Sequence, residues 1–379
     1  MSVRIESIDV IILQDSQADY VKFEGSYQNV LVIIKADNGM IGIGETDSPP
    51  RVIEAIIKTS SYNSLSQGLE ELLLGEDLDD PKRLWNKMFN ATQWHGRVGV
   101  TIHAMSAIDI ALWDLYSKIH NKPVYEFLGG LKHKSISAYA TIYPMEKVQK
   151  DWEQQIQDVL DKGFKKIKIC VESWWSDVNF TLKTLKNLRT FVGPNIDLML
   201  DVALEITDVK ILEQFIPTLE ELDFKWLEAP LPLWQIKEHK YLVSKYNIPI
   251  GVGDLGLTTK NEFDIFINEN AFDIAQPDLT MFGGFTQYLE LKKALLGTKK
   301  RIIPHAYNTN ITIAANLQVL CSQEKKELLE YSTSPSILRK ELTNETFILD
   351  SNGDVLVNEN SSGLGLTINW DIVKKCRQA

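Results

Sequence analysis

Three acidic residues each follow a short apolar run in the second half of the chain. Asp201 ends the run Leu-Met-Leu-Asp, Glu228 ends Trp-Leu-Glu, and Asp254 follows Gly-Val-Gly. Adjacent strands lie about 4.8 Å apart, so carboxylates at the ends of three neighbouring strands can converge on one ion. Oxygen ligands without His or Cys suit a hard cation, usually Mg²⁺. A single such carboxylate is more often a helix cap or a solvated group, but three in register repel each other without a cation.

A histidine and an aspartate follow two later apolar runs. His305 stands in Pro304-His305-Ala306, and Asp278 stands in Gln-Pro-Asp one predicted strand earlier. A carboxylate beside an imidazole keeps one ring nitrogen protonated and raises the basicity of the other, which is typical of a general base. The other histidines have no comparable partner, and we expect His103 and His120 to pack or cap within a helical region.

Two further charged residues belong to the same set of candidates. Strand alternation puts Lys166, Lys168 and Cys170 on one side of a predicted strand. In a barrel of strands ringed by helices, that side faces either the barrel interior or the helices. The functional interpretation is that Lys168 points at the metal and at a substrate carboxylate, and the alternative is a solvated lysine. Glu330, in Leu-Glu-Tyr, is another acid near the site, and its alternative is a structural salt bridge.

The chain from about residue 135 repeats strand and helix eight times, at the spacing of one unit of an eight-fold barrel. The predicted strands span residues 136–139, 166–171, 197–202, 225–228, 248–253, 273–276, 301–304 and 328–331. Helical segments fit between them, for example 146–161 with Gly163 as its stop. Eight units favour a closed parallel barrel over a doubly wound sheet, and no glycine-rich nucleotide motif follows the first strand.

The first part of the chain has a different pattern. Residues 30–35 and 40–44 flank Asp37-Asn38-Gly39, which predicts a hairpin, and apolar residues between Ile102 and Leu112 mark a long helix. We therefore predict an α+β capping domain over residues 1–130, a (β/α) barrel over 131–346, and a tail from about 347 to 379 that packs on the capping domain. The polar stretch 14–27 is predicted to be a long loop.

Composition excludes several classes of partner. The 379 residues carry a formal net charge of -11, and nucleic acids and anionic membranes both need a basic surface. The three cysteines show no paired spacing, which is typical of a reducing compartment. The N-terminus alternates polar and apolar residues as a strand does, and no apolar run approaches the roughly 20 residues of a membrane span. We expect a cytoplasmic protein.

Several of these motifs together resemble the enolase superfamily, and more narrowly its mandelate racemase-like subgroup. They are Trp-Leu-Glu-Ala-Pro at 226–230, Asp-Ile-Ala-Gln-Pro-Asp at 273–278 followed by Gly283-Gly284, Pro304-His305 followed by residues 310–315, residues 107–114, residues 123–130 and Gly-Leu-Gly at 363–365. The resemblance runs nearly end to end. It implies an α+β capping domain over a modified (β/α) barrel of TIM-barrel type, and one Mg²⁺ per subunit that holds the substrate carboxylate.

The resemblance also assigns roles to residues. By motif, Asp201, Glu228 and Asp254 correspond to the metal ligands, and His305 with Asp278 to the base dyad. Lys168 falls at the first lysine of the family's Lys-x-Lys pair, and Glu330 falls where family members carry an acid opposite the metal. The capping loops, at about 14–27 and 47–51, are implied to close over a small hydroxy-acid or sugar-acid substrate and to set specificity. A homo-oligomer is also implied.

Two departures from the family pattern affect the expected reaction. The third ligand position, usually Glu in this subgroup, is Asp254, which keeps the charge and shortens the reach. The second lysine of the pair is Cys170, unless the register slips to Lys166-x-Lys168. A racemase needs a second base, whereas one histidine can serve a dehydratase as base and then as acid. We therefore expect a lyase, an acid-sugar dehydratase that forms a 2-keto-3-deoxy acid.

Three alternatives stay open. A racemase or epimerase of a 2-hydroxy acid would use Glu330 or Lys168 as its second base. A non-catalytic binding barrel is the remaining possibility from another class. The cycloisomerase and dipeptide-epimerase branch resembles the chain less, because it has a lysine on the sixth strand, where this chain has Ala275, Gln276 and Asp278.

Overall fold

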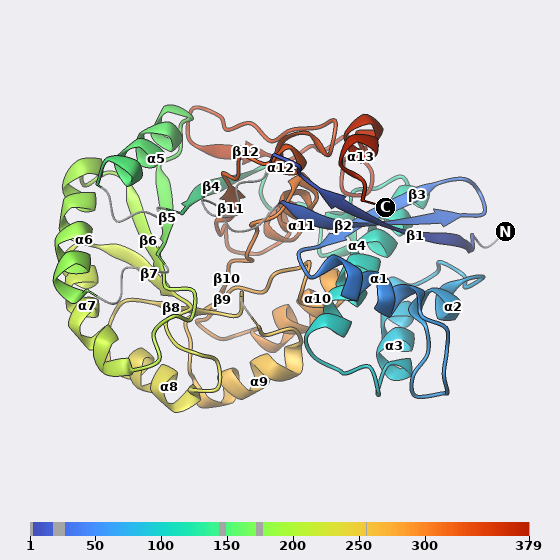
Figure 1. Cartoon of the computed structure of the whole chain (residues 1–379), viewed down its shortest axis with the longest axis horizontal. Helices are drawn as coiled ribbons and strands as arrows, with labels where there is room; N and C mark the ends of the chain where they lie inside the picture. The colour runs from blue at the N-terminus through green and yellow to red at the C-terminus, as the bar shows by residue number, and fades with distance from the viewer. Residues whose placement is uncertain (1–2, 18–26, 144–148, 172–176, 255, 379) are drawn as a thin grey trace.

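The computed structural model of the chain describes residues 3–17, 27–143, 149–171, 177–254 and 256–378. Two parts are visible, a curled sheet ringed by helices and a smaller region with its own antiparallel sheet (Figure 1). The predicted fold class, an α/β barrel-like unit with an α+β N-terminal region, is confirmed. Most of the predicted 14–27 loop lies outside the described residues.

The N-terminal region is a three-stranded meander covered by helices. Its strands are β1 (Ile5–Gln14), β2 (Gln28–Ala36) and β3 (Ile41–Thr46), in the antiparallel order β1-β2-β3. Gly39 has φ +83°, as the predicted Asn-Gly turn between β2 and β3 requires. The helices are α1 (Pro50–Lys58), α2 (Leu69–Leu73), α3 (Pro81–Ala91) and α4 (Val100–Ile119). None of the described helices combines the length and the apolar character that crossing a membrane requires.

Helix α4 is the long helix that the sequence predicts, and it lies between the two parts of the molecule (Figure 1). On one side it packs on β3, where the backbone oxygen of Ala107 leaves no room for a Cβ at Gly44. On the other side it contacts α10 (Gly284–Ala294), where the buried Asp109 accepts hydrogen bonds from the hydroxyl (2.6 Å) and the backbone N–H (3.0 Å) of Thr286. Burial raises the pKa of Asp109 to about 7.

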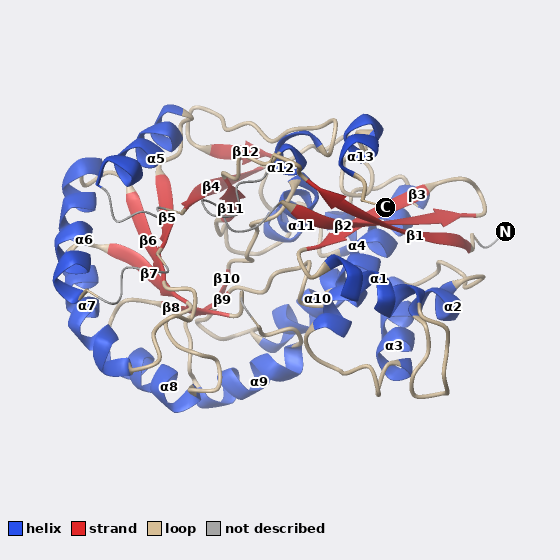
Figure 2. Ribbon diagram, viewed as in Figure 1, coloured by secondary structure: helices blue, strands red, loops and turns tan. Residues whose placement is uncertain are grey.

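The larger part is a parallel sheet that curls into most of a barrel (Figure 2). Its strands are β4 (Ser135–Ile142), β5 (Lys166–Cys170), β6 (Asp197–Asp201), β7 (Phe224–Glu228), β8 (Ile250–Val252), β9 (Ile274–Ala275), β10 (Arg301–Ile302) and β11 (Leu329–Ser332). All eight predicted strands are present, and each forms at its predicted place. Helices α5 (Gln149–Asp161), α6 (Val178–Val192), α7 (Val209–Glu221), α8 (Ile236–Lys245) and α9 (Lys260–Glu269) form the outer ring with α10 and α11 (Asn310–Cys321).

The hydrogen-bonded ladder runs β10-β9-β8-β7-β6-β5-β4-β11, and within the described residues it does not pair β10 with β11. The barrel is therefore open at this seam, where the sequence predicts closure. Strand β10 has only two residues: the Arg301 N–H donates on the β9 side, whereas the backbone oxygen of Ile302 accepts from the Gln323 side chain (3.1 Å) rather than from β11. A separate cluster of buried apolar side chains comes from four of these strands and from the residue after β10: Tyr139, Met199, Trp226, Ile274 and Ile303.

The C-terminal tail contacts both parts. Strand β12 (Asp354–Leu356) follows an Asn352-Gly353 turn and pairs antiparallel with β4, whereas α13 (Trp370–Cys376) packs on β1. Short helices η1 (Val124–Phe127) and α12 (Ile337–Glu341) complete the chain. The boundaries 1–130, 131–346 and 347–379 stay a prediction.

Candidate active site

Three buried carboxylates meet at the ends of three consecutive strands. Asp201 and Glu228 are partners in the register of β6 and β7, and Asp254 comes two residues after β8. One oxygen from each carboxylate lies within 4.8 Å of the others, an arrangement that could hold a metal ion. Burial raises the pKa of Glu228 and raises that of Asp254 well above its usual range, and the neighbouring carboxylates add to both shifts. The cluster is therefore electrostatically strained without a cation.

Local features of the strands hold these carboxylates in place. Glu228 accepts hydrogen bonds from Trp226 Nε1 (2.9 Å) and Gln276 Nε2 (2.5 Å). A Cβ at Gly251 would meet Gln276 Oε1 at 1.9 Å, so the strand needs glycine there to admit the amide. Gly253 has φ +125°, and the Phe263 ring would lie 2.4 Å from its Cβ. Glycines at both positions therefore let β8 approach its neighbours and present Asp254.

Lys168 on β5 lies beside the carboxylate cluster rather than on the outer surface. Its Nζ contacts Glu228, lies 2.9 Å from Glu330 and 3.5 Å from Asp201, and the side chain is fully buried. Burial alone would lower the pKa of Lys168, but the surrounding carboxylates outweigh it and raise the pKa well above its usual range. The lysine is therefore charged and offsets part of the negative charge around it.

Glu330 on β11 connects this lysine to the histidine. It accepts hydrogen bonds from the Thr141 hydroxyl and from the backbone N–H of Ala306 (2.9 Å), and it lies 4.0 Å from His305 Nε2. Burial alone would raise the pKa of Glu330, but the charges of Lys168 and His305 lower it to about 2. Because Glu330 forms an ion pair with Lys168, it also helps to hold the lysine side chain in place.

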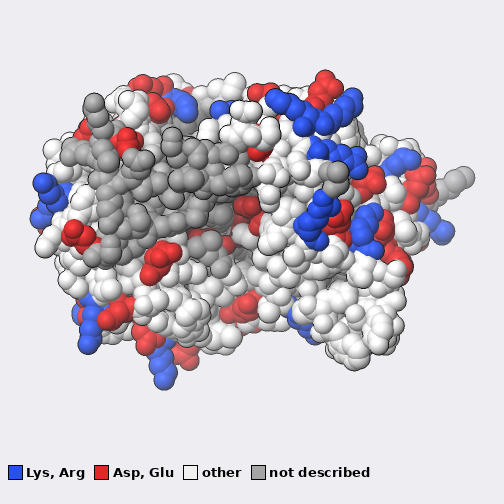
Figure 3. Space-filling view, viewed as in Figure 1, with Lys and Arg blue, Asp and Glu red and all other residues white. Residues whose placement is uncertain are grey.

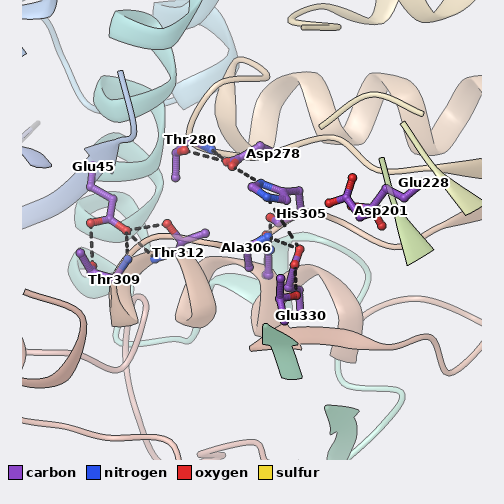
Figure 4. A network of polar contacts seen from close by, with 12 residues as sticks. Glu45, Asp201, Glu228, Asp278, Thr280, His305, Ala306, Thr309, Thr312 and Glu330 are labelled. Carbon is purple, nitrogen blue, oxygen red and sulfur yellow. Dashed lines mark hydrogen bonds and ion pairs between the residues drawn. The ribbon is translucent and has the colours of Figure 1, made fainter. Parts of the chain in front are cut away.

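The structure brings His305 and Asp278 together, as the sequence predicts. His305 Nδ1 lies 2.7 Å from Asp278 Oδ2, and Oδ1 of the same carboxylate accepts from the Thr280 backbone N–H and hydroxyl. Burial alone would lower the pKa of His305, but the Glu330 charge and the Asp278 hydrogen bond raise it to about 10. Figure 4 shows the imidazole between Asp278 on one side and Asp201 and Glu228 on the other.

Cys170 occupies the strand position of the missing lysine. It is buried at the end of β5, opposite Asp201 in the ladder with β6. The rings of Tyr143 and Tyr307 lie 4.8 Å apart, and both phenols lie near Cys170. Burial raises the pKa of both tyrosines, so these groups stay protonated at neutral pH. No amine from β5 other than Lys168 is within the buried part of the site that the structure describes.

A buried glutamate of the N-terminal sheet extends this polar network. Glu45 on β3 accepts hydrogen bonds from Asn29 Nδ2 and from the hydroxyls and backbone N–H groups of Thr309 and Thr312, at the start of α11. Asn316 of the same helix donates to the backbone oxygen of His305 (2.7 Å). Figure 4 shows Glu45 with Thr309 and Thr312 on one side and the separate contacts of His305 on the other. Sequence reasoning missed Glu45, because the two threonines that tie it to α11 are more than 260 positions away.

Two more residues near the site were not singled out from the sequence, although Asp47 lies in the 47–51 loop that the family resemblance places over the substrate. Asp47 directly follows β3, and the charges of Asp278 and His305 both affect it. His103 on α4 does not simply pack, because it lines a cavity beside Asp254 and Asp278, whereas His120 does cap α4 as expected. Figure 3 shows acidic side chains in the recess between the two parts of the molecule. A strand-end Asp followed by Ser-Pro-Pro is a weak signal that could have drawn attention to Asp47.

Comparison with known proteins supports the same family. Residues 9–129 match the family described as mandelate racemase / muconate lactonizing enzyme, N-terminal domain, and residues 151–372 match the enolase C-terminal domain-like family. The D-galactarolactone cycloisomerase of Agrobacterium fabrum is 26% identical, over 92% of this chain and 91% of that protein. The arabinonate dehydratase of Saccharolobus solfataricus is 29% identical, over 91% of this chain and 90% of that protein.

A solved structure is similar over nearly the whole chain. The 3,6-anhydro-D-galactonate cycloisomerase from Zobellia galactanivorans superposes with a TM-score of 0.89 at 26% identity, covering 99% of this chain and 100% of that one. The two family matches together include every candidate site residue. The chain therefore belongs to the enolase superfamily of enzymes, in its mandelate racemase-like subgroup.

Proposed function

We propose that this protein is a Mg²⁺-dependent acid-sugar dehydratase that converts a polyhydroxy acid into a 2-keto-3-deoxy acid. The observation that carries the proposal is the pairing of one histidine–aspartate dyad with a buried carboxylate triad, together with a cysteine where a second basic lysine would stand. The name of the Saccharolobus relative, arabinonate dehydratase, supports the same reaction.

The proposed metal ligands are Asp201, Glu228 and Asp254. Their donor set fits Mg²⁺, which prefers carboxylate oxygens and keeps waters or substrate in its other positions. Mg²⁺ held there would stabilise the negative charge that develops on the substrate carboxylate and would disfavour a protonated imidazole across the site. Lys168 supplies a further positive charge for the same carboxylate.

His305 is the proposed general base. Because Asp278 accepts from Nδ1, the other ring nitrogen is the one that can take the substrate's C2 proton. Loss of that proton forms the C2=C3 double bond and breaks the C3–O bond. The protonated imidazole then donates its proton to the departing hydroxyl, which leaves as water, and the enol product becomes the 2-keto acid. One histidine therefore completes the reaction as base and then as acid.

The racemase alternative needs a second base, and the contacts of its two candidates do not favour it. Lys168 and Glu330 form an ion pair with each other, and the raised pKa of the lysine and the lowered pKa of the glutamate both oppose proton exchange with a carbon acid. Tyr143 and Tyr307 stay protonated for the reason given above. A single-base reaction therefore fits the electrostatics better.

A cycloisomerase is a second candidate, because two of the similar proteins carry that name. In a sugar acid whose C3 oxygen belongs to a ring, the same proton abstraction and β-elimination would open the ring and keep all atoms. His305 would then return its proton to the ring oxygen. The two candidates differ only in whether the leaving oxygen is free or tethered to the substrate.

The test is a screen of acid sugars and their anhydro and lactone forms with Mg²⁺, read by mass spectrometry and by NMR in D₂O. A dehydratase gives a 2-keto acid lighter by one water. A cycloisomerase gives a product of unchanged mass. Accumulation of the C2 epimer would instead establish an epimerase, and the absence of any conversion or C2 deuterium exchange would contradict the enzymatic proposal.

A further inference from the structure

Asp47 is a half-buried carboxylate with no hydrogen-bond partner in the described part of the chain. It comes directly after β3 and lies near enough to the dyad for the charges of Asp278 and His305 to act on it. Burial, followed by the Asp278 charge, raises the pKa of Asp47 to about 7. Such a group is costly unless a ligand binds it, because a buried carboxylate normally accepts several hydrogen bonds.

His103 provides a second group of this kind, from a different element. Its Nδ1 lies 2.9 Å from the hydroxyl of Ser48, the residue after Asp47, and its Nε2 makes no hydrogen bond to any residue that the structure describes. Burial lowers the pKa of His103 to about 4, so the ring is neutral at physiological pH. Nε2 is therefore a free, uncharged hydrogen-bonding atom.

A cavity lies between His103 and two residues of the proposed site, Asp254 and Asp278, and the Ser48–His103 contact places Asp47 next to this wall. It has a volume of about 150 Å³, and its walls include His103, Asp254 and Asp278, with Leu257, Thr258 and Met281. A water molecule occupies about 30 Å³ in the liquid, so the cavity holds a few atoms of that size. It therefore extends the site from the carboxylate triad towards the N-terminal region by a few carbon atoms with their hydroxyls.

We propose that Asp47 and His103 bind hydroxyl groups at the end of the substrate that lies away from its carboxylate, and that the enzyme takes acid sugars with one carboxylate. This inference rests on the proposed function and names its substrate class. A sugar hydroxyl can donate to Asp47 and can donate to or accept from the neutral His103 ring.

The same charges argue against diacids. A second carboxylate at the distal end would meet Asp47 and Asp278, with the buried Glu45 behind them. His103 adds no positive charge, and none of the described residues that line the cavity is a lysine or an arginine. Like charges at short range in a partly buried site repel strongly. An aldonate, which ends in a neutral CH₂OH group, avoids this repulsion.

The first experiment compares an aldonate with the aldarate of the same configuration. The dissociation constant of each is measured by calorimetry, with excess Mg²⁺, in a His305→Asn background so that binding is read without turnover. We expect the aldonate to bind at least about tenfold more tightly. Equal or tighter binding of the aldarate would overturn the inference.

The second experiment tests the two residues. Asp47→Ala and His103→Phe should each weaken aldonate binding by about tenfold, the effect of one lost hydrogen bond to ligand. Asp47→Asn should reduce the difference between the aldonate and aldarate dissociation constants. It removes the repulsion of the second carboxylate and keeps a polar group. Matched controls are Asp9→Asn on the exposed face of β1 and His120→Phe at the end of α4, and both should bind like the parent.

The outcomes separate this inference from the proposed function. If acid sugars are dehydrated but Asp47→Ala and His103→Phe bind the aldonate unchanged, the subsite is wrong and the dehydratase stands. If no acid sugar is turned over, the dehydratase fails, and the binding series still decides the subsite. A changed pH profile of kcat in Asp47→Asn with unchanged aldonate binding would make Asp47 a proton-transfer group and would also overturn the inference.

Discussion

The imidazole of His305 is the group on which the proposed chemistry depends most. His305→Asn keeps a polar side chain of similar reach but cannot take the substrate proton. We expect kcat to fall by about 10²–10⁴-fold, the usual contribution of a general base, with substrate affinity nearly unchanged. Steady-state kinetics with Mg²⁺ titration checks this result. A parallel loss of Mg²⁺ affinity would show that the histidine acts through the metal site instead.

Cys170 tests whether a second base exists. Its thiol is buried, and the two neighbouring tyrosines stay protonated, so we expect Cys170→Ala to retain kcat within a few-fold. Turnover in D₂O, followed by NMR, should give the keto-deoxy product without the C2 epimer of the substrate. A Cys170→Ala variant as inactive as His305→Asn, or accumulation of the epimer, would favour the epimerase interpretation.

Among the elements, α11 depends on a contact from the N-terminal sheet. Glu45 accepts hydrogen bonds from Asn29, Thr309 and Thr312, and Glu45→Gln would turn an amide NH₂ towards these donors. A buried donor left unpaired costs about 1–3 kcal/mol, so the free energy of unfolding should fall by that order. Because Asn316 of α11 holds the His305 backbone, kcat should fall as well.

The Glu45 prediction has a matched control. Glu6→Gln makes the same change on the exposed face of β1 and should alter neither property. Mg²⁺ affinity should stay unchanged in Glu45→Gln, because the triad is on other strands. A loss of stability without any change in kcat would mean that Glu45 fixes the two parts of the molecule together but does not position the histidine.

The contact between α4 and α10 should give the protein a pH-dependent stability. Burial raises the pKa of Asp109 to about 7 in the folded state, against 3.8 as its usual value. The folded state therefore binds this proton more tightly, and the stabilising contribution, complete below about pH 4, is lost as the pH rises to about 7. Asp109→Asn should therefore gain stability relative to the wild type as pH rises through this window.

The measurement is urea unfolding of wild type and Asp109→Asn between pH 4.5 and 8. The difference in free energy of unfolding can change by at most about 1.4 kcal/mol per pH unit. Asp371→Asn, a nearly fully exposed position, should show no such trend. A difference that is flat with pH would mean that the Asp109 carboxyl is ionised in the folded protein throughout.

For the whole molecule, the carboxylate triad links metal binding to folding. The three carboxylates repel one another, so binding of Mg²⁺ should stabilise the folded state. At a free Mg²⁺ concentration one hundred times the dissociation constant, the free energy of unfolding should rise by about 2.7 kcal/mol. The raised pKa values of Glu228 and Asp254 also predict that binding releases protons. Calorimetry of Mg²⁺ binding in buffers of different ionisation enthalpy measures the number of protons released. Asp201→Asn should weaken the stabilisation, and an equal effect of Mg²⁺ on this variant would contradict the assignment.

Oligomeric state is a further property of the whole molecule. The expected homo-oligomer stays a prediction, as do the cytoplasmic location and the domain boundaries. Light scattering after size-exclusion chromatography measures the number of subunits directly.

Sequence alone was sufficient to predict which carboxylates meet. Asp201, Glu228 and Asp254 come from consecutive strands, and parallel strands in a barrel all end at the same rim, so a local pattern also gives the spatial neighbour. The pairing of His305 with Asp278 follows from the same rule for the next strands. The eight strands were predictable because each forms over a short apolar run bounded by turn residues.

Only the tertiary structure decided the features that depend on contacts between distant elements. The direction of Lys168 depends on which face of β5 the barrel encloses. The gap between β10 and β11 depends on a side chain from another element, since Gln323 donates to the Ile302 backbone oxygen. Glu45, Asp47 and His103 reach the site from the N-terminal region, whose docking brings together residues more than 150 positions apart. Strand periodicity carries no information on such docking, because it is set by the packing of complete elements against each other.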